Sequence, residues 1–117
     1  MHELGIVFEI QKRVMRFAQE NSINAKDIAK VVVEVGEAST IIPRYLHECW
    51  PAAFDGTAME GLELETQVIE ALVECKQCRT VYPYLANDKK CPSCSAWECW
   101  MVQGQEFMIK EIQVYEE

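Results

Sequence analysis

Residues 75–94 read CKQCRTVYPYLANDKKCPSC, a stretch with two Cys-x2-Cys pairs that twelve residues separate. Each pair predicts a tight turn that directs two thiolates to one side, so both turns together offer four sulfurs at tetrahedral corners. Soft thiolates suit Zn²⁺ and exclude Mg²⁺ and Ca²⁺. Because four ligands fill the coordination sphere, we expect the metal to be structural. The expected zinc ligands are Cys75, Cys78, Cys91 and Cys94.

Two other interpretations of these cysteines stay open. Iron in a rubredoxin-like site uses the same ligands, but the gap between the pairs is short for it. The glycine that usually follows each turn is also replaced, by Arg79 and Ser95. Four free thiols on unrelated turns are the plainer alternative. Of the two remaining cysteines, Cys99 is expected to be a free thiol and Cys49 a small buried side chain on a helix.

The cysteine-rich stretch interrupts two segments that alternate as strands do. Residues 62–70 alternate with Leu62, Leu64, Thr66 and Val68 on the inner face. Residues 106–115 form another strand, whose apolar phase shifts between Ile109 and Ile112, so we expect a bulge or an early end. The interruption predicts an inserted zinc-binding ribbon, residues 74–103, in a domain made of residues 1–73 and 104–117.

The ribbon is about thirty residues long and is expected to have little core. Modules of this size usually need their metal to fold. We expect four aromatic side chains to cover what core it has: Tyr82, Tyr84, Trp97 and Trp100.

Two helices and one further strand are expected before the ribbon. Residues 3–20 have helical periodicity, and residues 28–37 are expected to be a strand. The predicted inner stripe of the first helix includes Leu4, Val7, Phe8, Val14 and Ala18. The strand places Val31, Val33 and Val35 on one face and Val32 on the other.

The second helix is expected to follow Ser39 and Thr40, which are candidate N-caps, with Pro43 in its first turn. Pro51 is expected to kink or restart this helix, because its ring crowds the preceding turn. The fold class that results is α+β, with two helices packed on a small three-stranded sheet and an inserted zinc-ribbon module that has four cysteine ligands.

Length and charge limit the possible functions. The chain has 117 residues, enough for one domain with a small insert, and a formal net charge of −8. The acidic balance argues against binding to nucleic acid. Neither a signal peptide nor a membrane span is evident, and the clustered cysteines suggest a reducing compartment. We therefore expect a soluble cytoplasmic protein.

The N-terminus, Met1-His2-Glu3, offers a second possible metal site. The bulk of His2 disfavours removal of the methionine, so the free amine should stay on Met1. That amine, the His2 amide nitrogen and the His2 imidazole can close fused chelate rings around Ni²⁺ or Cu²⁺. Taken alone, a histidine at position 2 is far more often a frayed terminal residue.

In combination, the segments of the chain resemble the HypA/HybF family of nickel metallochaperones for hydrogenase maturation. The matching segments are Met1-His2-Glu3, Val33-Glu34-Val35-Gly36-Glu37 with Ser39, Phe54-Asp55-Gly56-Thr57, the two cysteine pairs, and Gly104-Gln105-Glu106-Phe107. They cover nearly the whole chain in order. The resemblance implies that His2 is the essential nickel ligand, with the Met1 amine and Glu3 close to the ion.

The resemblance also implies what the protein works with. It implies Ni(II) as transferable cargo, structural Zn(II), and delivery to a [NiFe]-hydrogenase large subunit precursor together with a nickel-handling GTPase. The chain is expected to be a monomer or a weak homodimer. His47, the other histidine, is expected to be a surface residue.

Two alternatives compete with the nickel carrier. A zinc-ribbon adaptor for protein interactions explains the cysteines but leaves Met1-His2-Glu3 unused. An enzyme has little support, because the sequence offers no open metal site, no nucleophile beside a base and no phosphate-binding glycine loop.

Overall fold

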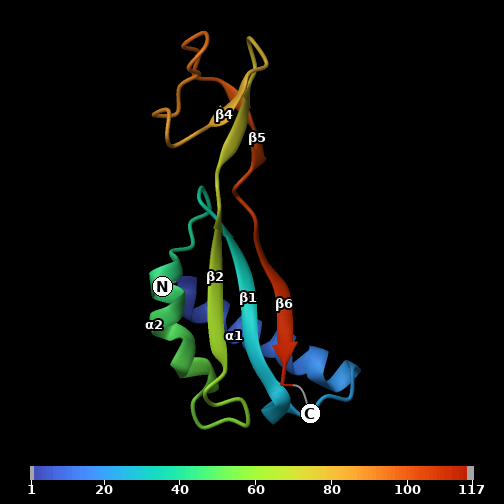
Figure 1. The fold of residues 1–117 in the computed structure, drawn as a ribbon. Helices are drawn as coiled ribbons and strands as arrows, with labels where there is room; N and C mark the ends of the chain where they lie inside the picture. Colours follow the sequence, from blue (N-terminus) through green and yellow to red (C-terminus); the bar gives the residue numbers. More distant parts are fainter. Residues whose placement is uncertain (1, 116–117) are drawn as a thin grey trace.

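The computed structural model describes residues 2–115, and their side chains from Glu3 onward. The molecule is elongated, 54 × 27 × 18 Å, with a small sheet at each end (Figure 1). The elements in chain order are α1 (His2–Glu20), a 3-10 helix (Ala25–Asp27), β1 (Ile28–Gly36), α2 (Pro43–Phe54), β2 (Glu63–Ile69), β3 (Leu72–Cys75), β4 (Val81–Pro83), β5 (Cys99–Gln103) and β6 (Phe107–Val114).

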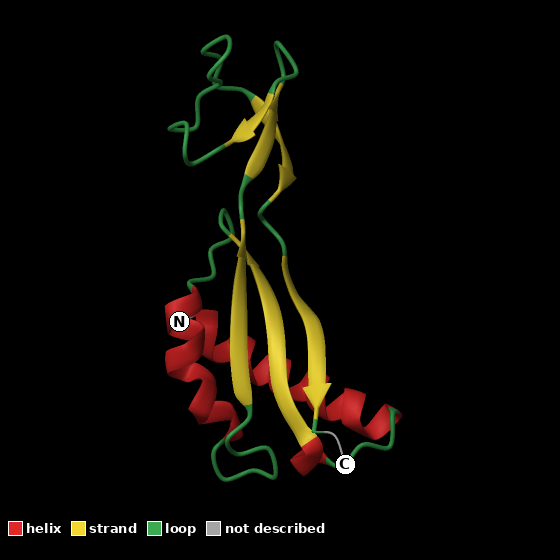
Figure 2. Ribbon diagram, in the orientation of Figure 1, coloured by secondary structure: helices red, strands yellow, loops and turns green. Residues whose placement is uncertain are grey.

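The larger end confirms the expected two helices on a three-stranded sheet. The strand order is β2-β1-β6, with β1 parallel to β2 and antiparallel to β6. Both helices lie on one face of this sheet, as Figure 2 shows, and α1 also contacts α2. Neither described helix is long and apolar enough to cross a membrane.

Alternation along β1 decides which side chains enter the core. Val31, Val33 and Val35 are buried against the two helices, as expected. Val32 lies on the opposite face and is also buried.

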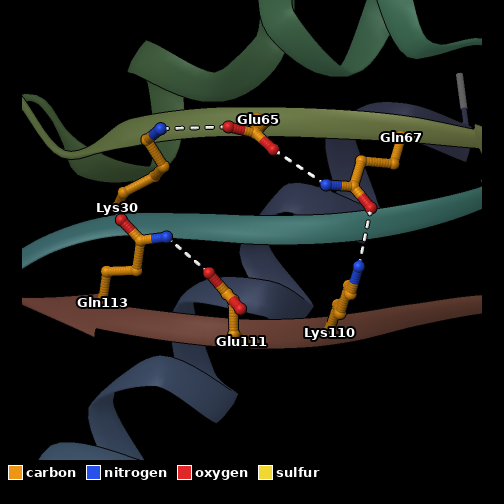
Figure 3. Close-up of polar contacts among 6 residues, drawn as sticks. All are labelled: Lys30, Glu65, Gln67, Lys110, Glu111 and Gln113. Carbon is orange, nitrogen blue, oxygen red and sulfur yellow. Dashed lines mark hydrogen bonds and ion pairs between the residues drawn. The ribbon is translucent and has the colours of Figure 1, made fainter.

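That outer face of the sheet carries a chain of polar contacts across all three strands (Figure 3). Lys30 Nζ lies 3.0 Å from Glu65 Oε1, and Gln67 Nε2 donates to Glu65 Oε2 at 2.9 Å. Lys110 Nζ donates to Gln67 Oε1 at 3.1 Å and completes this chain. A separate hydrogen bond on the same face joins Gln113, the donor, to Glu111 within β6. The aliphatic stems of such long side chains cover apolar surface, which accounts for a buried valine on a polar face.

The predicted inner stripe of α1 is partly wrong. Leu4 and Phe8 are 39% and 40% exposed. The buried stripe is instead Glu3, Val7, Ile10, Val14 and Ala18. Residues 4 and 8 are one position C-terminal to residues 3 and 7, so they point about 100° away from the core.

The start of α2 also differs from the expectation. Its N-cap residue is Ile42, and no side chain of its own segment caps it, whereas Pro43 takes the first turn as expected. Ser39 Oγ instead donates to Gly36 O at 2.7 Å. The helix continues through Pro51 without restarting and ends at Phe54, with Asp55 as its C-cap residue.

β6 contains the irregularity that its apolar phase predicted. Val32 pairs with Glu111 and Val33 with Ile109, so Lys110 is an extra residue in the ladder. A bulge of this kind shifts the side-chain alternation by one position. It keeps both Ile109 and Ile112 packed against the core.

The second sheet has the order β4-β3-β5, with antiparallel pairs throughout. Backbone segments cross tightly where it meets the first sheet. A Cβ atom on Gly36 would lie 2.2 Å from Gly104 O, and one on Gly104 would lie 2.4 Å from the Ala71 Cα. Ala38 N donates to Gly104 O at 2.7 Å, so a hydrogen bond joins the two backbone segments at this junction between the sheets.

Candidate metal centres

The four cysteines of the two Cys-x2-Cys pairs come together at the far end of the second sheet. Their Sγ atoms all lie within 4.8 Å of one another. The Cys75–Cys94 and Cys78–Cys91 sulfurs are each 3.5 Å apart. Four sulfurs at about 2.3 Å from one ion, at tetrahedral corners, would be separated by roughly 3.8 Å. The arrangement is therefore consistent with a zinc site.

Each cysteine pair forms a turn whose backbone supports the sulfurs. Gln77 N and Cys78 N donate to Cys75 Sγ at 3.4 and 3.5 Å. Arg79 N donates to Cys75 O, and Ser95 N donates to Cys91 O, both at 3.0 Å. Arg79 and Ser95 have φ angles of 65° and 67°, the conformation that glycine adopts most easily. Arg79 and Ser95 thus take the left-handed backbone conformation that glycine would supply at these positions.

The cysteines of this cluster differ in pKa. The Thr80 hydroxyl, 3.1 Å from Cys78 Sγ, and the Thr80 backbone lower the pKa of Cys78 to about 6. At Cys94 the Ala96 N–H favours the thiolate, but the Cys75 thiol, burial and the other cysteines outweigh it and raise the pKa to about 12. Four adjacent thiolates repel one another, so a divalent cation is needed to hold all of them deprotonated.

Only part of the expected aromatic cover lies in the core of the ribbon. Tyr82 is buried together with Val73, Cys75 and Cys91, and Tyr84 packs against this group. Trp97 and Trp100 are 65% and 44% exposed, so their assignment to the core was wrong. Cationic side chains cover their faces instead: Lys76 and Arg79 over Trp100, and Lys90 over Trp97.

The second expected centre is described only in part. Met1 and the His2 side chain lie outside the described residues, whereas the His2 backbone begins α1. Glu3 is 5% exposed, and its Oε2 accepts a hydrogen bond from Ile42 N at 3.2 Å. A carboxylate from the first turn of α1 therefore binds the backbone of Ile42, the N-cap residue of α2. The sequence did not signal this link, because Ser39 and Thr40 offered candidate caps close to Pro43.

The remaining candidate residues lie apart from the four-cysteine cluster. His47 is exposed on α2, and its Nε2 lies 3.2 Å from Thr66 Oγ1, so it is a surface residue as expected. Cys49 is buried in the core under the helices, also as expected. Cys99 is partly buried and packs against the ribbon core.

Comparison with known proteins identifies the family that the sequence resembles, and the match extends along nearly the whole chain. The model of the HypA family, described as a hydrogenase/urease nickel incorporation metallochaperone, matches residues 1–114. Hydrogenase maturation factor HypA of Trichodesmium erythraeum is 37% identical over 116 residues, covering 99% of this chain and 97% of the relative. HypA of Geobacter sulfurreducens is 33% identical over 114 residues, covering 97% and 99%.

Two solved structures share the fold. The solution structure of the Ni metallochaperone HypA from Helicobacter pylori matches with a TM-score of 0.65 and 22% identity, and covers 98% of each chain. A second solution structure of a HypA protein matches with a TM-score of 0.71 and 24% identity, and covers 100% of this chain and 98% of its own. The chain belongs to the HypA family of metallochaperones, which act in nickel incorporation during hydrogenase maturation.

Proposed function

We propose that this protein binds Ni(II) at its N-terminus and delivers it for [NiFe]-hydrogenase maturation. The observation that carries the proposal is the family match from residue 1 to residue 114, which includes Met1-His2-Glu3. The ligands would be the Met1 amine, the His2 amide nitrogen and the His2 imidazole, because nitrogen-rich, near-planar sets suit Ni²⁺. The site requires that Met1 is the first residue of the mature protein.

The environment of Glu3 supports this assignment. Its carboxylate is buried and bonded to Ile42 N, which ties the first turn of α1 to the loop before α2. An N-terminus attached to an anchored turn loses less freedom when it closes around an ion. We assign Glu3 a position close to the nickel, where its negative charge would also attract the cation.

In the same proposal the four-cysteine cluster holds Zn(II) as a structural ion. Cys75, Cys78, Cys91 and Cys94 would fill all four positions, so the metal would have no open site for a substrate. Residues 74–103 would form this ribbon, and residues 1–73 with 104–117 the nickel domain. No catalytic step is assigned to either metal, so the protein acts as a carrier and not as an enzyme.

The partners follow from the cargo. We assign a nickel-handling GTPase of the maturation system and the hydrogenase large subunit precursor, both in the cytoplasm. A carrier must release its ion to such partners, so the N-terminal site should be weak and exposed, while the zinc site should be tight. The net charge of −8 favours partners with basic surfaces over nucleic acid.

A calorimetric titration tests the proposal. Ni(II) is added to zinc-loaded protein that starts at Met1, to His2→Ala, and to His47→Ala as the matched control. His47 is exposed, and its Nε2 lies within hydrogen-bond distance of Thr66 Oγ1. We expect His2→Ala to lose binding and His47→Ala to match the wild type. Equal affinities for all three proteins would refute the N-terminal site and leave the zinc-ribbon adaptor as the better function.

A tag placed before Met1 gives an independent test. The extra residues convert the Met1 amine into an amide, which cannot serve as the amine ligand. We expect nickel binding to be lost from the tagged protein while one zinc per chain remains. Retained nickel affinity would show that the N-terminal amine is not a ligand.

A further inference from the structure

Cys99 faces the zinc ligand Cys75 directly across two antiparallel strands. The register of β3 and β5 pairs Glu74 with Trp100 and Cys75 with Cys99. Lys76 N donates to Glu98 O at 3.1 Å, one pair further along. Because hydrogen-bonded and non-hydrogen-bonded pairs alternate in such a ladder, Cys75 and Cys99 form a non-hydrogen-bonded pair.

The other bonds of Cys75 agree with this assignment. Its N–H donates to Thr80 O, and its C=O accepts from Arg79 N, so both groups point toward β4 and away from Cys99. Residues opposite each other in a non-hydrogen-bonded pair have Cα atoms about 4.5 Å apart and side chains on the same face. Disulfides span Cα distances of about 4.4–6.8 Å. The backbone therefore allows a Cys75–Cys99 disulfide without rearrangement.

The two thiols differ in access. Cys75 is fully buried, whereas Cys99 is partly exposed and packs against the ribbon core that contains Cys75. Of these two thiols, a small oxidant therefore reaches Cys99 first, and Cys75 is placed to react second.

A buried polar group lies beside Cys99. The hydroxyl of Tyr82 has no hydrogen-bond partner among the described residues, and the Cys99 side chain lies close to it. A tyrosine hydroxyl can donate a hydrogen bond. An oxygen atom added to the Cys99 sulfur would give this donor the acceptor that it lacks.

We propose that Cys75 and Cys99 form a redox pair, which a hydroperoxide joins as a disulfide and which thereby opens the four-cysteine site. This inference rests on the proposed zinc site, since it concerns one of its four ligands. It assigns a chemical role to Cys99, which metal binding leaves unused.

The oxidation takes place in two steps. The Cys99 sulfur attacks one peroxide oxygen, the O–O bond breaks, and the products are a Cys99 sulfenic acid and an alcohol or water. The Cys75 thiolate then attacks the Cys99 sulfur, so that an S–S bond forms, the S–O bond breaks and the hydroxide leaves as water after taking up a proton. In total the Cys99 thiol and the Cys75 thiolate lose two electrons, the Cys99 thiol gives up its proton, and one further proton comes from solvent. The bond between Cys75 and the metal breaks, and the peroxide is reduced to an alcohol or water and one further water.

Oxidation removes one of four thiolates from the metal. Three thiolates hold zinc less tightly, and the short ribbon depends on its metal for structure. Reduction by a dithiol would restore the site. Oxidative conditions would thus loosen the ribbon of this carrier without affecting the larger sheet.

The test compares two single variants, Cys99→Ala and the matched control Cys49→Ala, with the wild type. Cys49 belongs to the other core, so its loss leaves the ribbon intact. Zinc content is measured first by atomic absorption, and hydrogen peroxide is then added while a chromogenic chelator records zinc release. Trypsin and a glutamate-specific protease cut after Lys76 and Glu98, which separates Cys75 from Cys78 and Cys99 from Cys94 for disulfide mapping.

We expect one zinc per chain in all three proteins before oxidation. Wild type and Cys49→Ala should release it with formation of a Cys75–Cys99 disulfide, and Cys99→Ala should release it at least about fivefold more slowly. Equal release rates in Cys99→Ala and wild type, or disulfides confined to the four ligands, would overturn the inference. A wild-type protein without zinc would instead refute the proposed metal site, while disulfide mapping of that metal-free protein would still decide whether Cys75 pairs with Cys99.

Discussion

The two sheets of this protein have three strands each, but their cores differ in kind. Among the described residues, fifteen buried side chains form the core under β2-β1-β6, and nearly all of them are aliphatic or aromatic. The core at β4-β3-β5 has four buried residues, of which two are the cysteines Cys75 and Cys91. Burial of apolar area stabilises a fold by about 25 cal/mol per Å².

The difference leads us to expect that the larger unit folds through its apolar core and the ribbon through the metal proposed for its four cysteines. Four buried side chains do not offset the conformational entropy of about thirty ordered residues, at roughly 1–2 kcal/mol for each backbone. The predictions below separate these two sources of stability.

Removal of the metal is expected to have the largest effect, and it should affect the ribbon alone. Chelation should unfold β3, β4 and β5, since structural zinc contributes about 10–16 kcal/mol of apparent binding free energy in comparable small modules. Hydrogen exchange should increase at Val73 and Tyr82, while Val31 and Val33 stay protected. Equal loss of protection in both sheets would show that the two units fold as one.

Truncation in the larger core should give the opposite pattern. Phe54 is buried and its ring lies 4.4 Å from that of Trp50, so Phe54→Ala should destabilise the larger unit by about 3–5 kcal/mol. Chemical denaturation followed by tryptophan fluorescence measures the change, and zinc content should be unaffected. The control is Phe8→Ala: because Phe8 is 40% exposed, its truncation should cost clearly less.

The junction between the sheets is sensitive to a single methyl group. Gly104 has a φ angle of 107°, and a Cβ there would lie 2.4 Å from the Ala71 Cα. Gly104→Ala should destabilise the protein by about 2–4 kcal/mol in thermal unfolding, through backbone strain and overlap.

Gly5→Ala provides a control that should change the stability in the opposite direction. Nothing lies within 4 Å of a Cβ at Gly5, which is inside α1, so this variant should gain about 0.5–1 kcal/mol. An unchanged melting temperature in Gly104→Ala would mean that the junction is not packed as described.

The smallest expected effect is a dependence on pH at the same junction. Gly104 N donates to Glu106 Oε1 at 2.9 Å, and this bond holds the pKa of Glu106 below its ordinary value of 4.5. A lowered pKa in the folded state stabilises the fold above pH 4.5, and this contribution is lost as the pH falls through the folded value. Glu106→Gln should therefore be slightly less stable than wild type at pH 7.

Thermal melts between pH 7 and pH 3 measure this difference, which should vanish in acid. A difference that stays constant over the whole range would assign the effect of Glu106→Gln to packing and not to charge.

Much of the fold followed from local patterns in the sequence. Alternating valines predicted β1, the broken phase of Ile109 and Ile112 predicted the bulge in β6, and the spacing of the cysteines predicted the cluster. These patterns are visible because side-chain direction repeats every two residues in a strand and every 3.6 in a helix. The error in the first helix arose because two different faces of the helix show the same apolar spacing.

The first helix illustrates such a case. Leu4 and Phe8 form a stripe as apolar as that of Val7 and Ile10, and only the position of α1 over the sheet and α2 decides which stripe is buried. The exposed positions of Trp97 and Trp100 have a different cause, because a small ribbon has too little interior to hold them.

By itself, the sequence determined the two helices and three strands of the larger unit, their order and the clustering of the four cysteines, because covalent spacing and side-chain periodicity are local properties. Only the tertiary structure decided that Glu3 accepts a hydrogen bond from Ile42 N, 39 positions away, and that Cys99 faces Cys75. Such contacts depend on register and on how the elements pack, and neither is encoded in the spacing of neighbouring residues.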